Sequence, residues 1–334
     1  YSISETVPAG WDLNSATCDN GTIGAITVVA GQTTTCTFVN TKRGHIIVDK
    51  VTDPSGDGQS FGFTASYDGD GFSLTDAATP NDSGALVPGI YSVSETVPAG
   101  WDLLTATCDD QSNPANISLQ AGETVTCTFT NQKDSNIIVV KQTDPDGDET
   151  SFEFDPSYDD NFFLSDGDQN DSGDLDPGSY SVAEIVPAGW DLTSATCSDQ
   201  SDPASINLAA GETVTCTFNN QADANIIVVK QTDPNGDAQV FEFTASYDGD
   251  GFSLSDDGQN DSGDLNPGTY SVAENTPAGW DLTSATCDDG SEIDSIGLSA
   301  GETVTCTFNN QKDAFIIVDK VTDTINDPQS FDFT

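Results

Sequence analysis

The stretch from Ile226 to Gln311 shows the pattern on which the whole chain is built. It reads IIVVKQTDPNGDAQVFEFTASYDGDGFSLSDDGQNDSGDLNPGTYSVAENTPAGWDLTSATCDDGSEIDSIGLSAGETVTCTFNNQ. Short segments in which every second residue is apolar alternate, about every ten residues, with clusters of Gly, Pro, Asn and Asp, and no segment has a helical period. This pattern predicts an all-β domain in which two sheets pack face to face.

The same pattern recurs along the 334-residue chain. Copies begin at Ile46, Ile137, Ile226 and Ile316, which are 91, 89 and 90 residues apart. A unit of about ninety residues can hold its own core, so the sequence predicts a tandem array of Ig-like β-sandwich domains. The predicted divisions are a partial repeat at 1–45, full repeats at 46–136, 137–225 and 226–315, and a partial repeat at 316–334.

Within the first full repeat, the alternation and the turn residues place the strands. We expect them at 46–52, 60–67, 71–75, 90–95, 102–108, 116–119 and 124–131, with a linker at 132–136.

The balance of charge excludes several classes of protein. The chain has 56 Asp and Glu against 8 Lys and Arg, a net charge of -48. Such a charge repels phosphate backbones and anionic lipid head groups, which argues against a nucleic-acid partner. No run approaches the roughly 20 apolar residues of a membrane-spanning helix, so we expect no membrane insertion in this segment. With one histidine and no phosphate-binding glycine loop, the sequence does not indicate an enzyme.

Each repeat contains one pair of cysteines, 18 or 19 residues apart. The two partners lie on the last strand and on the strand that follows the tryptophan, and a zinc site would need four ligands where a repeat offers two. We therefore expect disulfides and an oxidising, extracellular compartment. The predicted pairs are Cys18 with Cys36, Cys108 with Cys127, Cys197 with Cys216, and Cys287 with Cys306.

The alternation of the strands also places three polar side chains on apolar faces. The first strand carries an inward lysine, the fourth an inward glutamate and the last an inward asparagine, and four of the seven lysines of the chain occupy this one repeat position. The inward residues are Lys50, Glu95 and Asn131; Lys141, Glu184 and Asn220; Lys230, Glu274 and Asn310; and, in the partial repeats, Lys320, Glu5 and Asn40.

The ordered motifs I-x-V-x-K, PG-x-Y-S-V-x-E-x-x-PAGW and C-T-F-x-N resemble the prealbumin-like, collagen-adhesin B-type (SpaA-like) repeat domains of bacterial surface adhesins and pilus backbones. In many members of that family the lysine and the asparagine form an intramolecular isopeptide bond, assisted by the glutamate. The resemblance implies such a bond in each full repeat, through autocatalysis by a lysine whose pKa burial has lowered. The alternative is a buried Lys–Glu pair that is hydrogen-bonded to the asparagine and needs no chemistry.

Acidic residues crowd the loops of the first half of each repeat. Alternating oxygen ligands in a glycine-bearing loop suit Ca²⁺, whereas the alternative is a set of solvated acidic turns. No other cofactor is implied. The candidate Ca²⁺ ligands are Asp53, Asp57, Asp144, Asp146, Asp148, Asp233 and Asp237.

Two features bear on glycans. A tryptophan follows each Pro-Ala-Gly turn. We expect its side chain to pack in the core; the alternative is a platform on which a sugar stacks. Asn-x-Ser/Thr sequons are candidates for glycosylation in an extracellular protein; they lie at Asn20, Asn81, Asn116, Asn170 and Asn260.

The two partial repeats leave apolar strands without a core of their own. We expect residues 316–334 of one copy to complete residues 1–45 of the next, giving a head-to-tail fibre in which Lys320 meets Glu5 and Asn40 of a neighbour. The alternative is that the sequence is a window on a longer array.

Together these patterns predict a structural protein, an extracellular or cell-surface stalk, fibre or filament. The second hypothesis is an adhesin shaft or binding module whose loops bind Ca²⁺ or whose surface binds glycans.

Overall fold

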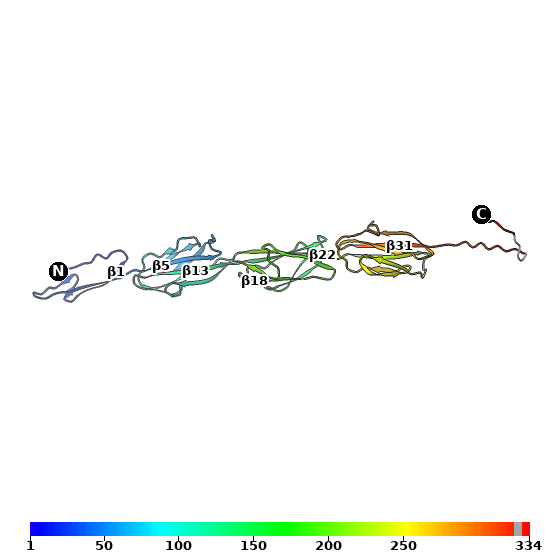
Figure 1. The fold of residues 1–334 in the computed structure, drawn as a ribbon. Coiled ribbons are helices and arrows are strands. Elements are labelled where there is room, and N and C mark those ends of the chain that lie inside the picture. The colour runs from blue at the N-terminus through cyan, green and yellow to red at the C-terminus, as the bar shows by residue number, and fades with distance from the viewer. Residues whose placement is uncertain (324–328) are drawn as a thin grey trace.

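The computed structural model describes residues 1–323 and 329–334 as an elongated row of β-rich units (Figure 1). Three separate apolar cores are built from residues of the first, second and third full repeats. We call these units 1 (residues 45–133), 2 (136–222) and 3 (225–312). Within the described ranges there are strands but no α-helices, which confirms the all-β class, and no helix there could span a membrane.

The strands repeat from unit to unit. Residues 1–42 form β1 (Trp11–Cys18), β2 (Gly21–Thr22), β3 (Ala25–Ile26) and β4 (Cys36–Lys42). Unit 1 contains β5 (His45–Asp53), β6 (Phe61–Ala65), β7 (Asp68–Leu74), β8 (Asn81–Asp82), β9 (Gly89–Tyr91), β10 (Val93–Thr96), β11 (Trp101–Cys108), β12 (Ile117–Leu119) and β13 (Thr124–Lys133). Unit 2 contains β14 (Asn136–Asp144), β15 (Phe152–Pro156), β16 (Phe162–Leu164), β17 (Gln169–Asp171), β18 (Gly178–Tyr180), β19 (Val182–Ile185), β20 (Trp190–Cys197), β21 (Ile206–Leu208) and β22 (Thr213–Ala222). Unit 3 contains β23 (Asn225–Asp233), β24 (Phe241–Ala245), β25 (Asp248–Leu254), β26 (Gln259–Asp261), β27 (Gly268–Tyr270), β28 (Val272–Asn275), β29 (Trp280–Cys287), β30 (Ile296–Leu298) and β31 (Thr303–Lys312).

Each unit pairs its first strand with its last. In unit 1 the larger sheet has the order β11-β13-β5-β8, and the smaller one has the order β10-β6-β7. Strands β5 and β13 run parallel, with Lys50 opposite Phe129 and Thr52 opposite Asn131. Because parallel neighbours at the two ends of a unit point the same way, the chain enters at one end of the unit and leaves at the other.

The cores are dense in aromatic rings. In unit 1, Phe63 stacks on Phe72 with ring centroids 5.3 Å apart and meets Phe129 edge-on at 5.1 Å. Trp101 is 7% exposed and lies edge-on to Phe61 at 5.2 Å, so this tryptophan packs in the core. Burying each such side chain contributes about 1.5–3 kcal/mol.

Three details differ from the expected strands of unit 1. The segment 90–95 is not one strand: β9 pairs with β12 and β10 pairs with β6, because the chain changes sheet at Ser92. The two-residue strand β8 pairs with β5 and is too short to produce a sequence pattern. The expected linker 132–136 is mostly strand, since β13 extends to Lys133 and β14 begins at Asn136.

The two ends of the chain are less complete. Strands β1 and β4 form a two-stranded sheet without the parallel strand that lies beside β13 in unit 1. At the opposite end (Figure 1), the residues after β31 that the structure describes form no strand, and several large apolar side chains are exposed there. These are Phe315, Ile316, Ile317, Val318, Val321, Phe331 and Phe333.

Candidate functional site: buried lysine triads

Each complete unit buries one lysine in its core. Lys50 is 2% exposed, and Lys141 and Lys230 are fully buried. Each lies on the first strand of its unit, on the face that also carries the buried isoleucine and valine, because side chains two apart on a strand share a face. The alternation therefore places an amine where apolar groups are expected.

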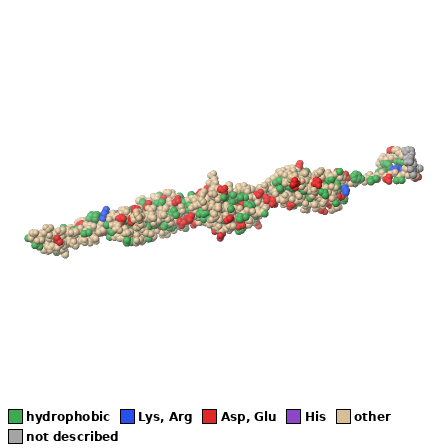
Figure 2. Space-filling model, turned by 60° about the horizontal axis from the view of Figure 1, so that its bottom comes forward, with side chains coloured by type: hydrophobic (Ala, Val, Ile, Leu, Met, Phe, Trp, Pro, Cys, Tyr) green, Lys and Arg blue, Asp and Glu red, His purple; other side chains and the backbone are tan. Residues whose placement is uncertain are grey.

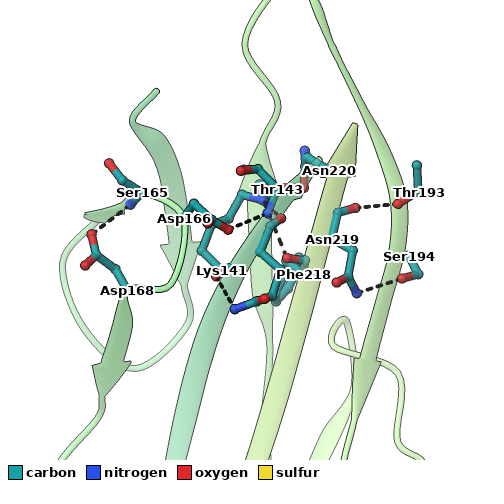
Figure 3. A network of polar contacts seen from close by, with 12 residues as sticks. Lys141, Thr143, Ser165, Asp166, Asp168, Thr193, Ser194, Phe218, Asn219 and Asn220 are labelled. Carbon is teal, nitrogen blue, oxygen red and sulfur yellow. Dashed lines mark hydrogen bonds and ion pairs between the residues drawn. The ribbon is translucent and has the colours of Figure 1, made fainter. Parts of the chain in front are cut away.

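The amine lies beside the amide of the asparagine on the last strand. The lysine Nζ donates to the asparagine Oδ1 at 2.9 Å in unit 1, 2.9 Å in unit 2 and 2.7 Å in unit 3. Figure 3 shows this region of unit 2, with Lys141 and Asn220 on adjacent strands. These are the lysine and asparagine pairs inferred from the resemblance: Lys50–Asn131, Lys141–Asn220 and Lys230–Asn310.

The glutamate completes each triad from the other sheet. The lysine Nζ is 3.8 Å from a carboxylate oxygen of Glu95 in unit 1, and 3.7 Å from one of Glu184 in unit 2 and of Glu274 in unit 3. Both side chains of each ion pair are fully buried. One group from each of three strands thus meets in the core.

A phenylalanine that the sequence did not single out covers the amine. The Nζ atom lies 4.0 Å from the ring centroid of Phe61, 4.1 Å from that of Phe152 and 4.3 Å from that of Phe241 in the respective units. A ring face attracts the charged amine, while its bulk keeps water away. Its position as the first apolar residue of the second strand is the signal that could have identified it.

Burial changes the protonation of the triad. Burial lowers the pKa of the Lys50, Lys141 and Lys230 amines, and the neighbouring carboxylates oppose this effect only in part. Burial likewise raises the pKa of Glu95 and Glu184. Both directions favour a neutral amine beside a neutral carboxylic acid over an ion pair.

Several polar atoms of the triads have no hydrogen-bond partner. In units 1 and 2 these atoms are the asparagine Nδ2 and both carboxylate oxygens, on Asn131, Glu95, Asn220 and Glu184. In unit 3, Asn310 Nδ2 donates to Glu274 Oε1 at 2.5 Å, and only Oε2 lacks a partner. Each unsatisfied buried group costs about 1–3 kcal/mol, so the unreacted triads lower the free energy of unfolding of units 1 and 2.

An aspartate in a neighbouring loop, which sequence reasoning also missed, fixes the chain just after the lysine. In unit 2, Asp166 accepts hydrogen bonds from the backbone N–H of Gly147 at 2.7 Å and of Thr143 at 2.6 Å. These donors hold the pKa of the Asp166 carboxyl below its usual value. The equivalents are Asp76 and Asp256, at the same distance after a buried leucine.

The first partial repeat contains the asparagine and the glutamate of a triad, and the last contains the lysine. Asn40 Nδ2 donates to Glu5 Oε1 at 2.6 Å, so the amide and the carboxylate meet at the N-terminal end. Lys320 lies in the segment that follows β31, at the opposite end of the molecule (Figure 1), and its Nζ is 4.2 Å from the ring centroid of Phe331. The structure of one copy therefore does not bring Lys320 to Glu5 and Asn40.

Disulfides join the last strand to its antiparallel neighbour. The bonded pairs are Cys18–Cys36, Cys108–Cys127, Cys197–Cys216 and Cys287–Cys306, as the spacing predicts. In unit 2, Cys216 lies four residues before Asn220 on β22. The disulfide and the triad thus act on the same strand from opposite sides.

The expected Ca²⁺ ligands do not converge in this structure. Within residues 1–323 and 329–334, no group of three or more Asp, Glu, His or Cys side chains is arranged to hold a metal ion. Many of the carboxylates bind side chains of their own unit instead: Asp57 with Lys133, Asp237 with Lys312, Asp53 with Gln132, Asp144 with Gln221 and Asp233 with Gln311. Asp148 accepts from the Thr150 N–H, and Asp146 lies in the same loop. Calcium binding stays a prediction.

The sequons lie at the surface. Asn81, Asn170 and Asn260 are partly exposed on the edge strands β8, β17 and β26, and Asn116 is exposed. Asn20 is partly exposed and donates through Nδ2 to the Thr27 carbonyl at 2.7 Å. Glycosylation likewise stays a prediction.

Comparison with known families now places the chain. The model of the prealbumin-like fold domain matches residues 46–133, 137–222 and 226–312, which is most of the chain. The chain belongs to the prealbumin-like domain family. The resemblance seen in the motifs is thereby confirmed, and the three matched ranges are the three segments that hold the lysine triads.

The solved structures that this prealbumin-like chain matches share little sequence with it. The Bacillus anthracis TIE protein is 16% identical with a TM-score of 0.34, covering 84% of this chain and 55% of its own. The pilus adhesin SpaC of Lactobacillus rhamnosus GG is 14% identical with a TM-score of 0.26, covering 87% and 46%. BcpA, the major pilin subunit of Bacillus cereus, is 13% identical with a TM-score of 0.31, covering 81% and 100%. The chain thus spans about half the length of the first two, and no curated protein matches it in sequence.

Proposed function

We propose that this chain is a structural segment of an extracellular or cell-surface fibre, in which the β-sandwich units carry tension along the axis. The observation that supports this most is the pairing of the first and last strands of each unit. A pull on the two ends of a unit loads these parallel strands in shear, so that all the hydrogen bonds between them resist together. The lysine and the asparagine of each triad lie on the same two strands.

We further propose that the triads react. The neutral Nζ of lysine attacks the side-chain carbonyl carbon of asparagine, and the C–Nδ2 bond breaks as the new C–N bond forms. The glutamic acid gives a proton to the leaving nitrogen and takes one from Nζ, so that the products are one amide and one ammonia. The hydrogen bond between Lys141 Nζ and Asn220 Oδ1, and the Asn220 Nδ2 without a partner, support this step.

The test is the intact mass of the reduced, denatured chain. Three bonds lower the mass by about 51 Da, or about 17 Da for each ammonia lost. In Lys141→Arg the loss falls to that of two bonds, since a guanidinium at this position cannot form the amide, and Glu184→Gln gives the same loss because the proton carrier is gone. Lys133→Arg, at a partly exposed lysine outside the triads, keeps all three. An unmodified mass in the native chain would mean that the triads are only buried polar clusters.

We also propose that a second copy completes residues 1–45. The octapeptide Ile316–Asp323 is identical in sequence to Ile46–Asp53, which forms strand β5 in unit 1. Its apolar side chains are exposed, and β4 lacks the parallel neighbour that β5 gives to β13. In the completed unit, Lys320 of one copy faces Glu5 and Asn40 of the next.

Denaturing electrophoresis of the concentrated chain tests this association. We expect a ladder of covalent multimers that is absent in Lys320→Arg and retained in Lys42→Arg, a lysine that lies outside the triads. A single band from the native chain, together with a monomeric mass in solution, would show that copies of this chain do not complete one another.

A further inference from the structure

The three joints between successive parts of the chain share one backbone arrangement. The residue at each joint donates its N–H backward to a glycine carbonyl, and the following residue exchanges two hydrogen bonds with a leucine of the next unit. The joint residues are Arg43, Asp134 and Asp223; their glycine partners are Gly10, Gly100 and Gly189 at 2.8, 3.1 and 3.0 Å. The forward pairs are Gly44 with Leu86, Ser135 with Leu175, and Ala224 with Leu265. We call these joints junctions 1, 2 and 3.

The side chain at junction 1 is a cation that connects both sides. Arg43 binds both carboxylate oxygens of Asp12 at 2.8 Å, on the N-terminal side of the joint. Its Nη1 also donates to the Ala85 carbonyl of unit 1 at 3.5 Å. One guanidinium thus neutralises the local carboxylate and reaches the next unit.

Junction 2 carries the opposite charge in the same place. Asp134 faces Asp102 of unit 1 and Asp174 and Asp176 of unit 2, and these four residues line a cavity of about 440 Å³ with Tyr158, Leu175 and Tyr180. Burial raises the pKa of Asp134, and the three carboxylates raise it further. The adjacent Lys133 does not offset them, because its Nζ pairs with Asp57 of unit 1 at 3.1 Å. The Glu212 carboxylate of unit 2 accepts from its own turn, at Ala209.

Junction 3 repeats the acidic arrangement with even less positive charge. Burial raises the pKa of Asp223, with Asp191 of unit 2 and Asp264 of unit 3 adding to the effect. Ala222 occupies the position held by Lys133 at junction 2 and Lys42 at junction 1. Carboxylates therefore face each other across junctions 2 and 3, while junction 1 has an ion pair.

We infer that junction 1 is a fixed joint, whereas junctions 2 and 3 are electrostatic hinges that open by repulsion at low ionic strength and close when salt or acid removes the repulsion. Like charges on the two sides of a junction push the two units apart, and screening weakens this force once the Debye length falls to about 8 Å near 0.15 M salt. The hydrogen bonds of Ser135 and Ala224 to the next unit break when the hinge opens. This inference is independent of whether the triads react.

Hydrogen exchange of single amides in the full chain measures each hinge separately. At fixed pH, raising the salt concentration is expected to increase protection several-fold at Ser135 and Ala224 and to leave Gly44 unchanged. The amides of Val93, Val182 and Val272 are bonded within their own units and correct for any change in global stability. Equal responses at Gly44, Ser135 and Ala224 after this correction would overturn the inference.

Charge exchange between the junctions gives the second test. Asp134→Arg is expected to abolish the salt response at Ser135, and Arg43→Asp to create one at Gly44. Glu242→Arg, which makes the same charge change on an exposed strand position of unit 3, serves as the matched control and leaves all three responses as they are. An Asp134→Arg chain that keeps its disulfides and still responds at Ser135 would contradict the hinge.

Discussion

At the scale of the residue, the decisive feature is an amine in an apolar core. Lys141 has an amide oxygen at 2.9 Å, a carboxylate oxygen at 3.7 Å and a ring face at 4.1 Å. The carboxylate is too far for a hydrogen bond but near enough for a proton to move through small side-chain motions. The triad therefore resembles a reaction site more closely than a tight ion pair.

The lowered lysine pKa gives a prediction for stability against pH. In the triple variant Asn131→Ala, Asn220→Ala and Asn310→Ala, the lysines cannot form amides and remain titratable. Burial lowers their pKa in the folded state below the ordinary value of 10.5. The unfolded chain then binds more protons between the folded-state pKa and 10.5, so the free energy of unfolding rises as pH rises through this window.

Under the proposed reaction the lysines of the native chain are amides, so we expect the native chain to lack this alkaline rise. Urea denaturation at a series of alkaline pH values compares the two proteins, and equal slopes would argue that the native lysines are still free amines. The glutamates act in the opposite sense at lower pH. Burial raises the pKa of Glu95 and Glu184 above 4.5, so in the triple variant stability falls as pH rises from 4.5 through their folded-state pKa.

At the scale of the element, the last strand of each unit is the most constrained. In unit 2, β22 pairs in parallel with β14 and antiparallel with β20, and it contains both Cys216 and Asn220. The disulfide joins β22 to β20, and the triad joins it to β14. Loss of the disulfide leaves the triad in place, and loss of the triad leaves the disulfide.

Removal of one disulfide should therefore weaken a unit without unfolding it. For Cys197→Ser with Cys216→Ser, the loop that opens spans 19 residues, and its closure is worth about 3 kcal/mol. Scanning calorimetry is expected to show one transition at lower temperature, with those of units 1 and 3 unchanged. A simultaneous shift of all transitions would mean that the units do not melt independently.

The sequence predicted the elements whose evidence is local. Alternation alone placed Lys50, Glu95 and Asn131 on inward faces, because each lies within a strand of regular period. It could not show that the chain changes sheet at Ser92, since this depends on hydrogen bonds to Ser66, 26 residues away. The sequence did not identify Asp166 or the Phe152 ring that covers the Lys141 amine for the same reason: the groups they contact lie far along the chain.

At the scale of the whole molecule, charge is distributed along a line of units (Figure 2). The whole chain has a net charge of -48, and every unit carries carboxylates on its surface. Three of the seven lysines, by contrast, are buried in the cores. Surfaces of like charge repel one another until salt screens them. Among the cations outside the cores, Lys42, Arg43 and Lys133 lie at or near junctions 1 and 2.

The proposed lysine–asparagine bond determines how a unit responds to a pull along its axis. A bond between Lys141 and Asn220, which are 79 positions apart in the sequence, lets force bypass the chain between them, so unit 2 cannot extend. Without it, force unfolds the unit and extends all of its chain outside the disulfide loop, roughly 200 Å at about 3.5 Å per residue.

Single-molecule pulling of the full chain, held at its ends, measures whether a covalent bond joins the first and last strands of each unit. We expect units 1, 2 and 3 to give no extension steps, and Lys141→Arg to restore one step of roughly 200 Å. Three such steps in the native chain would contradict this expectation, because they would show that the first and last strands are held by hydrogen bonds alone.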